Sequence, residues 1–239
     1  MQIIACEMME NEIKKAIEET GVQYPVAWLE RGLHSSPEKL RAALQEKLDA
    51  LPAGETALLA YSQCGNAALG LVCSCSRMVI PNFADCVRLM LSDMPGHVNE
   101  ADMHTLYSSK GWLDSDRSMR AEYKKCLDKY GPKRTDMVYR EILKGYCNFC
   151  LMDTGAYRIE DYEKKAKETA ELFHLNYKTC PGYIRVYKKM FQGEWDQDFI
   201  VKNMARHFRW MIFIWGMWGS RCRLCEGTGE AYVRERAVF

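Results

Sequence analysis

Short apolar runs alternate with amphipathic segments along the first hundred residues. Residues 2–6, 26–29, 55–61 and 77–81 are apolar runs of strand length, with polar residues, glycine or proline between them. Apolar spacings of three or four predict a helix from Glu7 to Glu19 and a second that begins at Ser36-Pro37. Strands that alternate with helices predict βαβ units, and therefore a parallel sheet with right-handed crossovers.

The alternation is less regular after residue 96 and then returns. The expected strands are 105–107, 149–152, 175–179 and 199–201, and the expected helices are about 116–130, 134–146, 159–173 and 183–191. We therefore expect an α/β protein with an open, mostly parallel sheet and flanking helices. Two α/β lobes, residues 1–96 and 97–203, are expected to enclose a cleft, and residues 204–239 are expected to form a C-terminal appendage.

Composition adds one strong feature, the cysteines. The chain has 33 basic and 32 acidic residues, so we expect neither a nucleic-acid nor a membrane partner. The most apolar stretch, Trp210 to Trp218, is too short to cross a bilayer. Eleven cysteines is a high count for 239 residues. The chain starts with a strand-like run rather than an export signal, so we expect a reducing cytoplasm, where cysteines serve as metal ligands, catalytic groups or buried thiols.

Three cysteines follow three of the predicted strands. Cys6 ends the first strand, Cys64 follows the third, and Cys86 follows the fourth. The carboxyl ends of parallel strands share one edge of a sheet, which is where open α/β sheets place their ligands. Three thiolates can bind a soft metal or an iron–sulfur cluster and leave one coordination position open. The alternative is three buried thiols, since free cysteine is among the most buried residue types.

Four neighbouring residues complete the candidate site. His34 follows the second strand on the same predicted edge, and Asp85 precedes Cys86. Either side chain can ligate a metal or carry a proton, and we assign them the catalytic roles. For Asp85, capping of a helix N-terminus is the alternative. Gly65 and Asn66 form the turn after Cys64 and are the candidate cofactor-binding residues.

Two CxxC pairs, Cys147/Cys150 and Cys222/Cys225, lie outside this edge. The 71 residues between them exceed the usual spacing of a structural zinc site, so a shared zinc site is only weakly indicated. Cys147 and Cys150 fall at the start of a predicted strand, where burial is expected. The glycine-rich fingerprints of dinucleotide sites and P-loops are missing, as is the Gly-x-Ser-x-Gly motif of α/β-hydrolases.

Six short motifs occur in a characteristic order. They are Cys6-Glu7, Gly32-Leu33-His34, Tyr61-x-x-Cys64-Gly65-Asn66, Pro81-x-x-x-Asp85-Cys86, Gly111-Trp112 and Gly193-Glu194-Trp195-Asp196. Over about residues 2–202 the chain resembles the prokaryotic family catalogued as domain of unknown function 1638. Two features depart from that family: Asn82 stands where arginine is usual, and the segment from about residue 204 differs from the family's ending.

The resemblance implies a protein of anaerobes, with some relatives encoded beside corrinoid-dependent methyl-transfer systems. One hypothesis is a cytoplasmic enzyme in one-carbon metabolism, in which zinc, iron or an iron–sulfur cluster on the three cysteines acts as Lewis acid toward a small molecule. A second is a non-catalytic accessory protein that delivers a metal or corrinoid to a methyltransferase. A third is a metal-free α/β interaction module. The sequence leaves all three open.

Overall fold

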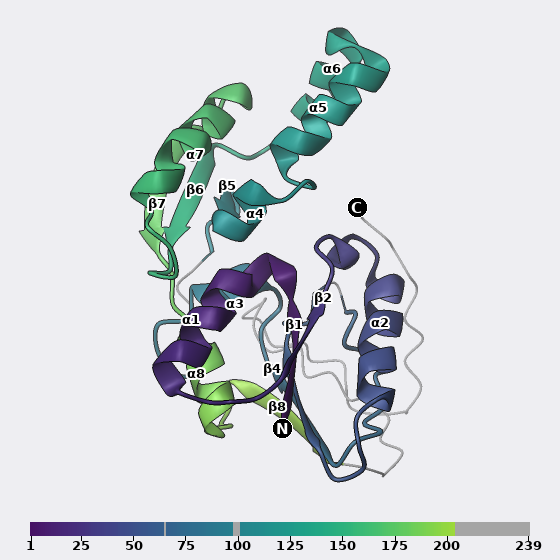
Figure 1. Cartoon of the computed structure of the whole chain (residues 1–239). Helices are drawn as coiled ribbons and strands as arrows, with labels where there is room; N and C mark the ends of the chain where they lie inside the picture. Colours follow the sequence, from purple (N-terminus) through teal and green to yellow (C-terminus); the bar gives the residue numbers. More distant parts are fainter. Residues whose placement is uncertain (65, 98–100, 204–239) are drawn as a thin grey trace, which may run out of the picture. The chain divides into compact units, whose positions relative to one another are not determined.

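The computed structural model describes residues 1–64, 66–97 and 101–203 (Figure 1). Its first sheet is built from β1 (Gln2–Cys6), β2 (Val26–Leu29), β3 (Thr56–Ala60), β4 (Arg77–Pro81) and β8 (Phe199–Asn203). The strand order is β2-β1-β3-β4-β8. The first four strands are parallel, and β8 runs antiparallel to β4. The α/β class with a mostly parallel sheet, predicted from the alternation of strands and helices, is correct.

Both faces of this sheet are covered, which explains the continuous apolar runs of its strands. The helices of this part are α1 (Glu10–Thr20), α2 (Pro37–Asp49), α3 (Cys86–Met90) and α8 (Arg185–Gln192), with short 3-10 turns η1 (Glu7–Met9) and η2 (Leu33–Ser35). Ile3 of β1 faces the cluster formed with α1 and α8, whereas Ile4 faces the cluster formed with α2. Figure 1 shows α2 on one side of the strands and α1 with α8 on the other.

The second sheet contains three parallel strands, β5 (Thr105–Ser108), β6 (Asn148–Asp153) and β7 (Asn176–Pro181), in the order β5-β6-β7. Its helices are α4 (Lys110–Asp114), α5 (Met119–Tyr130), α6 (Pro132–Ile142) and α7 (Glu160–Leu172). Gly131 separates α5 from α6 and Pro132 is the first residue of α6, so the helices are divided at the Gly131-Pro132 pair, as the sequence predicts. A third apolar cluster joins α7 to one face of β6 and β7.

The chain returns to the first sheet after β7. Helix α8 packs against α1, and β8 pairs with β4 over five residues, from Arg77↔Asn203 to Pro81↔Phe199. Residues 185–203 therefore belong structurally with the first sheet, although the sequence groups them with the second lobe. The predicted division at residues 96 and 97 stays a prediction, and the predicted appendage, 204–239, lies outside the described residues.

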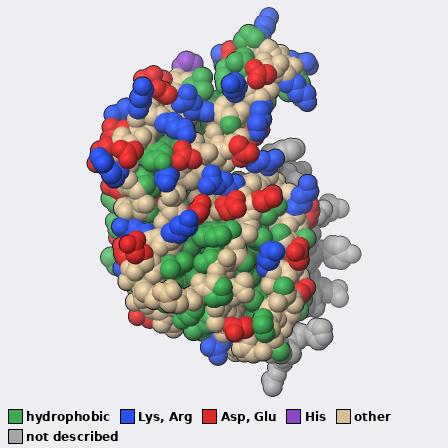
Figure 2. Space-filling view, viewed as in Figure 1, with side chains coloured by type: hydrophobic (Ala, Val, Ile, Leu, Met, Phe, Trp, Pro, Cys, Tyr) green, Lys and Arg blue, Asp and Glu red, His purple; other side chains and the backbone are tan. Residues whose placement is uncertain are grey.

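Close contacts connect the two sheets. A Cβ on Gly111 of α4 would lie 1.9 Å from the carbonyl oxygen of Met8, so only glycine fits at this approach. Lys110 donates to Asn11 on α1, and Thr154 donates to Glu12. On the face shown in Figure 2, basic and acidic side chains are interspersed. Within the described chain, no helix combines the length and apolarity needed to cross a bilayer.

Candidate functional site

The three candidate cysteines lie beyond three adjacent parallel strands. Cys6 is the last residue of β1, Cys64 lies in the turn after β3, and Cys86 is the first residue of α3, which follows β4. Strand β3 pairs with β1 on one side and with β4 on the other. All three side chains are partly buried and free of disulfides.

The thiols are close enough to affect one another's ionisation. Burial raises the pKa of the Cys64 thiol to about 12, and negative charge on Cys6 contributes to the rise. Burial also raises the pKa of Cys86, with further contributions from Cys64, Asp85 and Cys6. Cys6 is shifted in the same direction, mainly by burial. The structure therefore brings three mostly neutral thiols together at one edge of the sheet.

The buried Tyr61 hydroxyl borders the Cys6 thiol, and the next residue in the chain, Ser62, also has a buried hydroxyl. The Tyr61 hydroxyl interacts with the Cys6 thiol, which moderates the rise in the pKa of Cys6. Neither Tyr61 Oη nor Ser62 Oγ makes a hydrogen bond of ordinary geometry with the described residues. Buried hydroxyls are usually hydrogen-bonded, so these two groups have capacity for a ligand or a water molecule.

The turn that carries Cys64 has an unusual backbone. Cys64 and Asn66 have φ angles of 42° and 68°, in the left-handed region that residues other than glycine seldom adopt. Such conformations are concentrated at functional sites. The backbone carbonyl of Asn66 accepts a hydrogen bond from Arg41 Nη2 on α2 at 3.3 Å. Gly65, the other predicted cofactor-binding residue, lies outside the described residues.

The two predicted proton carriers are placed differently. Asp85 caps α3: its Oδ1 accepts a hydrogen bond from the backbone N–H of Arg88 at 2.8 Å, and its Oδ2 pairs with the Arg88 guanidinium. This is the capping role that the sequence offers as the alternative. His34 lies in η2, which follows the carboxyl end of β2 and therefore lies at the same edge of the sheet as the cysteines. Its side chain is outside the described part of the structure.

Metal-ligand geometry is a stricter condition than proximity. Among the side chains that the structure describes, no group of three or more His, Cys, Asp and Glu residues is arranged to hold a metal ion. The thiols at the carboxyl edge have the donor chemistry of a soft-metal site. In the described structure, however, these thiols are not arranged around one common metal position.

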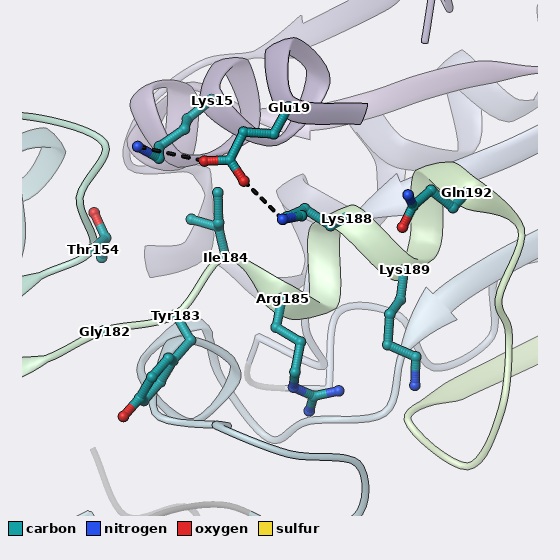
Figure 3. A pocket seen from close by; sticks show the side chains of 10 residues that line it. All are labelled: Lys15, Glu19, Thr154, Gly182, Tyr183, Ile184, Arg185, Lys188, Lys189 and Gln192. Carbon is teal, nitrogen blue, oxygen red and sulfur yellow. Dashed lines mark hydrogen bonds and ion pairs between the residues drawn. The ribbon is translucent and has the colours of Figure 1, made fainter. Parts of the chain in front are cut away.

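A hollow of about 380 Å³ lies elsewhere, between α1, α8 and the ends of β6 and β7 (Figure 3). Its cations are paired: Lys15 and Lys188 both contact Glu19, at 3.5 and 2.8 Å. Arg185 contacts Asp198 at 2.7 Å. The sequence does not indicate this hollow, because its wall combines segments that are distant along the chain. The lining has four cations and one carboxylate, Glu19, and each of these cations is already paired with a carboxylate.

Two further features were not expected from the sequence. Glu12 on α1 is fully buried, and this burial raises the pKa of its carboxyl to about 7. Glu12 lies between Met9 and Ala16 in the apolar stripe of the helix, and that position was the available signal. In the second sheet, Cys150 contacts Cys180 of β7. Cys147, its partner in the CxxC pattern, is exposed, and Cys222 and Cys225 lie outside the described residues.

Comparison with known proteins identifies the family. The family model described as "Protein of unknown function (DUF1638)" matches residues 28–191, more than half of the chain. This range contains His34, Cys64, Asp85 and Cys86, whereas Cys6 precedes it. Comparisons with curated proteins and with solved structures produced no match. The chain belongs to the DUF1638 family.

Proposed function

We propose that the carboxyl edge of the first sheet binds a soft metal ion, zinc or iron, or an iron–sulfur cluster through Cys6, Cys64 and Cys86. The observation that supports this proposal is the gathering of three thiols from three separate strand ends, close enough for their charges to interact. Thiolates are the ligands that zinc, iron and iron–sulfur clusters select. A cytoplasmic location is part of the proposal, because a reducing compartment keeps these thiols free.

The donor set fits such a metal, and the arrangement requires one adjustment. A bound cation favours the thiolate form that burial opposes, so metal and ligands stabilise each other. The described thiols are not at ligand geometry, and binding therefore involves a movement. We assign that movement to the turn that carries Cys64, since the backbone of Cys64 and Asn66 is in the left-handed region that such residues seldom adopt.

Three protein ligands leave one position for a small molecule, and a metal in that position supplies Lewis acidity. The Tyr61 hydroxyl, which lies beside Cys6, is available to hydrogen-bond a bound molecule. Asp85, by contrast, is already paired with Arg88. This pairing favours the accessory role, delivery of a metal or corrinoid to a methyltransferase, over proton transfer by Asp85 in an enzyme.

Anaerobic purification followed by metal analysis and visible spectroscopy tests the proposal. We expect one metal ion or cluster per chain, and we expect Cys64→Ser to weaken Zn²⁺ or Co²⁺ binding by at least about 100-fold with the fold retained. Cys126→Ser is the matched control, because Cys126 is also a partly buried free thiol but lies in the second lobe. Wild-type protein without stoichiometric binding, or equal losses in both variants, contradicts a metal site at this edge.

A further inference from the structure

A second pair of thiols lies on one face of the second sheet. Cys150 is buried in the central strand β6, and Cys180 is partly exposed on the neighbouring strand β7. The parallel register pairs Cys150 with Lys178 and Met152 with Cys180. Since alternate residues share a face, Cys150, Lys178 and Cys180 point to the same side of the sheet. The two cysteines are therefore diagonal neighbours.

The distance between the two sulfur atoms is 3.0 Å. A disulfide bond is about 2.05 Å long, so the sulfur atoms must approach by about 1 Å, and the diagonal placement, with Cα atoms roughly 7–8 Å apart, also requires the edge strand β7 to shift toward β6. The second close thiol pair of the described chain, Cys73 and Cys75, has its sulfur atoms 3.7 Å apart. Of the two pairs, Cys150 and Cys180 are better placed for a covalent bond.

We propose that Cys150 and Cys180 form a redox-active dithiol that exchanges with small-molecule disulfides. Strand β7 is at the edge of its sheet, and Cys180 itself is only partly buried, so a small reagent in solution can reach its sulfur. Cys150 lies behind it with no exposed surface. This arrangement assigns the attacking role to Cys180 and the resolving role to Cys150.

Local electrostatics support the same assignment. The Cys150 thiol donates its hydrogen to Cys180, and this bond, together with the Lys178 ammonium, lowers the pKa of Cys180. The same contact and burial raise the pKa of Cys150. The thiolate is the nucleophile in thiol–disulfide exchange, so the accessible sulfur is also the activated one.

The exchange proceeds in two displacements. The Cys180 thiolate attacks one sulfur of a low-molecular-weight disulfide, RSSR; a mixed disulfide forms, the reagent's S–S bond breaks, and RS⁻ leaves and takes a proton from water. Cys150 then releases its proton to water, and its thiolate attacks Sγ of Cys180, which expels the second RS⁻; this thiolate in turn takes a proton from water. The protein loses two electrons and two protons, and one RSSR becomes two RSH. The reverse reaction reduces the pair.

Peptide mapping of the full-length protein tests this proposal with oxidised glutathione as the probe. After incubation and alkylation of remaining thiols, we expect a disulfide between Cys150 and Cys180, with a mass loss of two hydrogens that a dithiol reductant reverses. Cys147→Ser is the control for the CxxC pattern, since Cys147 is exposed, and the link is expected to persist in this variant. The Cys150→Ser variant is expected to retain glutathione on Cys180.

The outcomes separate clearly. A link between Cys147 and Cys150, or a Cys150–Cys180 pair that stays reduced in the wild-type protein, overturns the proposal. Glutathione on other cysteines of Cys150→Ser, but not on Cys180, overturns the assignment of the attacking sulfur. The wild-type map requires no substitution, so a variant that fails to fold does not affect the main result.

Discussion

At the scale of single residues, Glu12 couples the stability of the fold to pH. Its carboxyl is buried between α1 and the segment after β6, where Thr154 donates to it at 3.1 Å and its second oxygen has no hydrogen-bond partner in the described structure. Burial raises the pKa of Glu12 from about 4.5 to about 7, and Lys110 opposes the rise only weakly. The folded protein therefore retains a proton that the unfolded chain loses at lower pH.

We expect Glu12→Gln to remove this pH dependence. Below pH 4.5 the carboxyl is mostly protonated in both the folded and the unfolded chain, so its ionisation does not lower the free energy of unfolding. As pH rises toward 7 the unfolded chain ionises first, so the free energy of unfolding falls, by on the order of 3 kcal/mol at full effect. Glutamine stays neutral and keeps the acceptor for Thr154. Denaturant unfolding from pH 4 to pH 8 is expected to show a stabilised variant at pH 8 and little difference at pH 4.

Glu18→Gln is the matched control, because Glu18 is on the same helix but exposed. This variant is expected to follow the wild-type pH profile. If Glu12→Gln is destabilised equally at pH 4 and pH 8, the carboxyl has a packing or hydrogen-bonding role that does not depend on its proton.

Residue-scale prediction from the sequence succeeded where chemistry is local. The capping alternative for Asp85 followed from its position before α3, and the structure shows this cap. The contact between Cys150 and Cys180 was not predicted, because it depends on the register of β6 with β7, which are separated by α7. The sequence predicted burial for both Cys147 and Cys150; this is correct for Cys150 and wrong for Cys147, whose side chain is exposed.

At the scale of elements, periodicity identified most strands and helices. The helix expected from Ser36-Pro37 begins at Pro37, and Gly21 ends α1 with a φ angle of 69°, as its C′ role requires. The return of β8 to the first sheet was not predicted. A run such as Phe199-Ile200-Val201 indicates a strand but carries no information about its partner. The pairing with β4 is set by tertiary contacts.

One of these contacts is the side chain of Asp198, which fixes β8 and α8 together. It is almost fully buried, and its Oδ1 accepts from the backbone of Gly96 at 2.9 Å. Its Oδ2 accepts from Arg185 and Lys189 of α8, at 2.7 and 3.3 Å. We expect Asp198→Asn to lower the free energy of unfolding by about 2–4 kcal/mol, because it leaves the partly buried Arg185 without its carboxylate. Lys189, in contrast, keeps its pair with Asp196. Denaturant unfolding at pH 7 measures the loss.

The control for charge removal is Glu168→Gln. Glu168 pairs with Arg120 at 2.9 Å on the surface, and exposed pairs contribute less than about 1 kcal/mol. If the free energy of unfolding falls by a similar small amount in both variants, the hydrogen bonds and ion pairs of Asp198 are not what holds α8 and β8 in place.

At the scale of the whole molecule, the carboxyl ends of parallel strands share one edge of the sheet, and this rule explains how much of the candidate site could be predicted. Strand order alone places Cys6, Cys64 and Cys86 at one edge, and the structure brings them within reach of one another's charge. The separations needed for a shared metal depend on loop conformation, which the apolar pattern does not encode. The left-handed backbone of Cys64 is one such detail.

The extent of the folded unit is testable by truncation. Chain contacts group Met1–His207 into one compact unit, and the apolar clusters of the described chain are built from residues between Ile3 and Phe199. We therefore expect a chain that ends after His207 to unfold cooperatively, with a melting temperature within a few degrees of the full-length protein. We also expect it to bind metal with unchanged stoichiometry, because the proposed ligands are retained.

A chain that ends after Gln192 is the matched comparison, since it keeps α8 but removes Asp198 and β8. Loss of β8 exposes the edge of β4 and leaves Arg185 without its carboxylate, so this shorter chain is expected to aggregate or to unfold without cooperativity. Loss of cooperative unfolding in the longer truncation as well would show that residues beyond 207 contribute to the core. Loss of metal alone would instead implicate Cys222 and Cys225 as ligands.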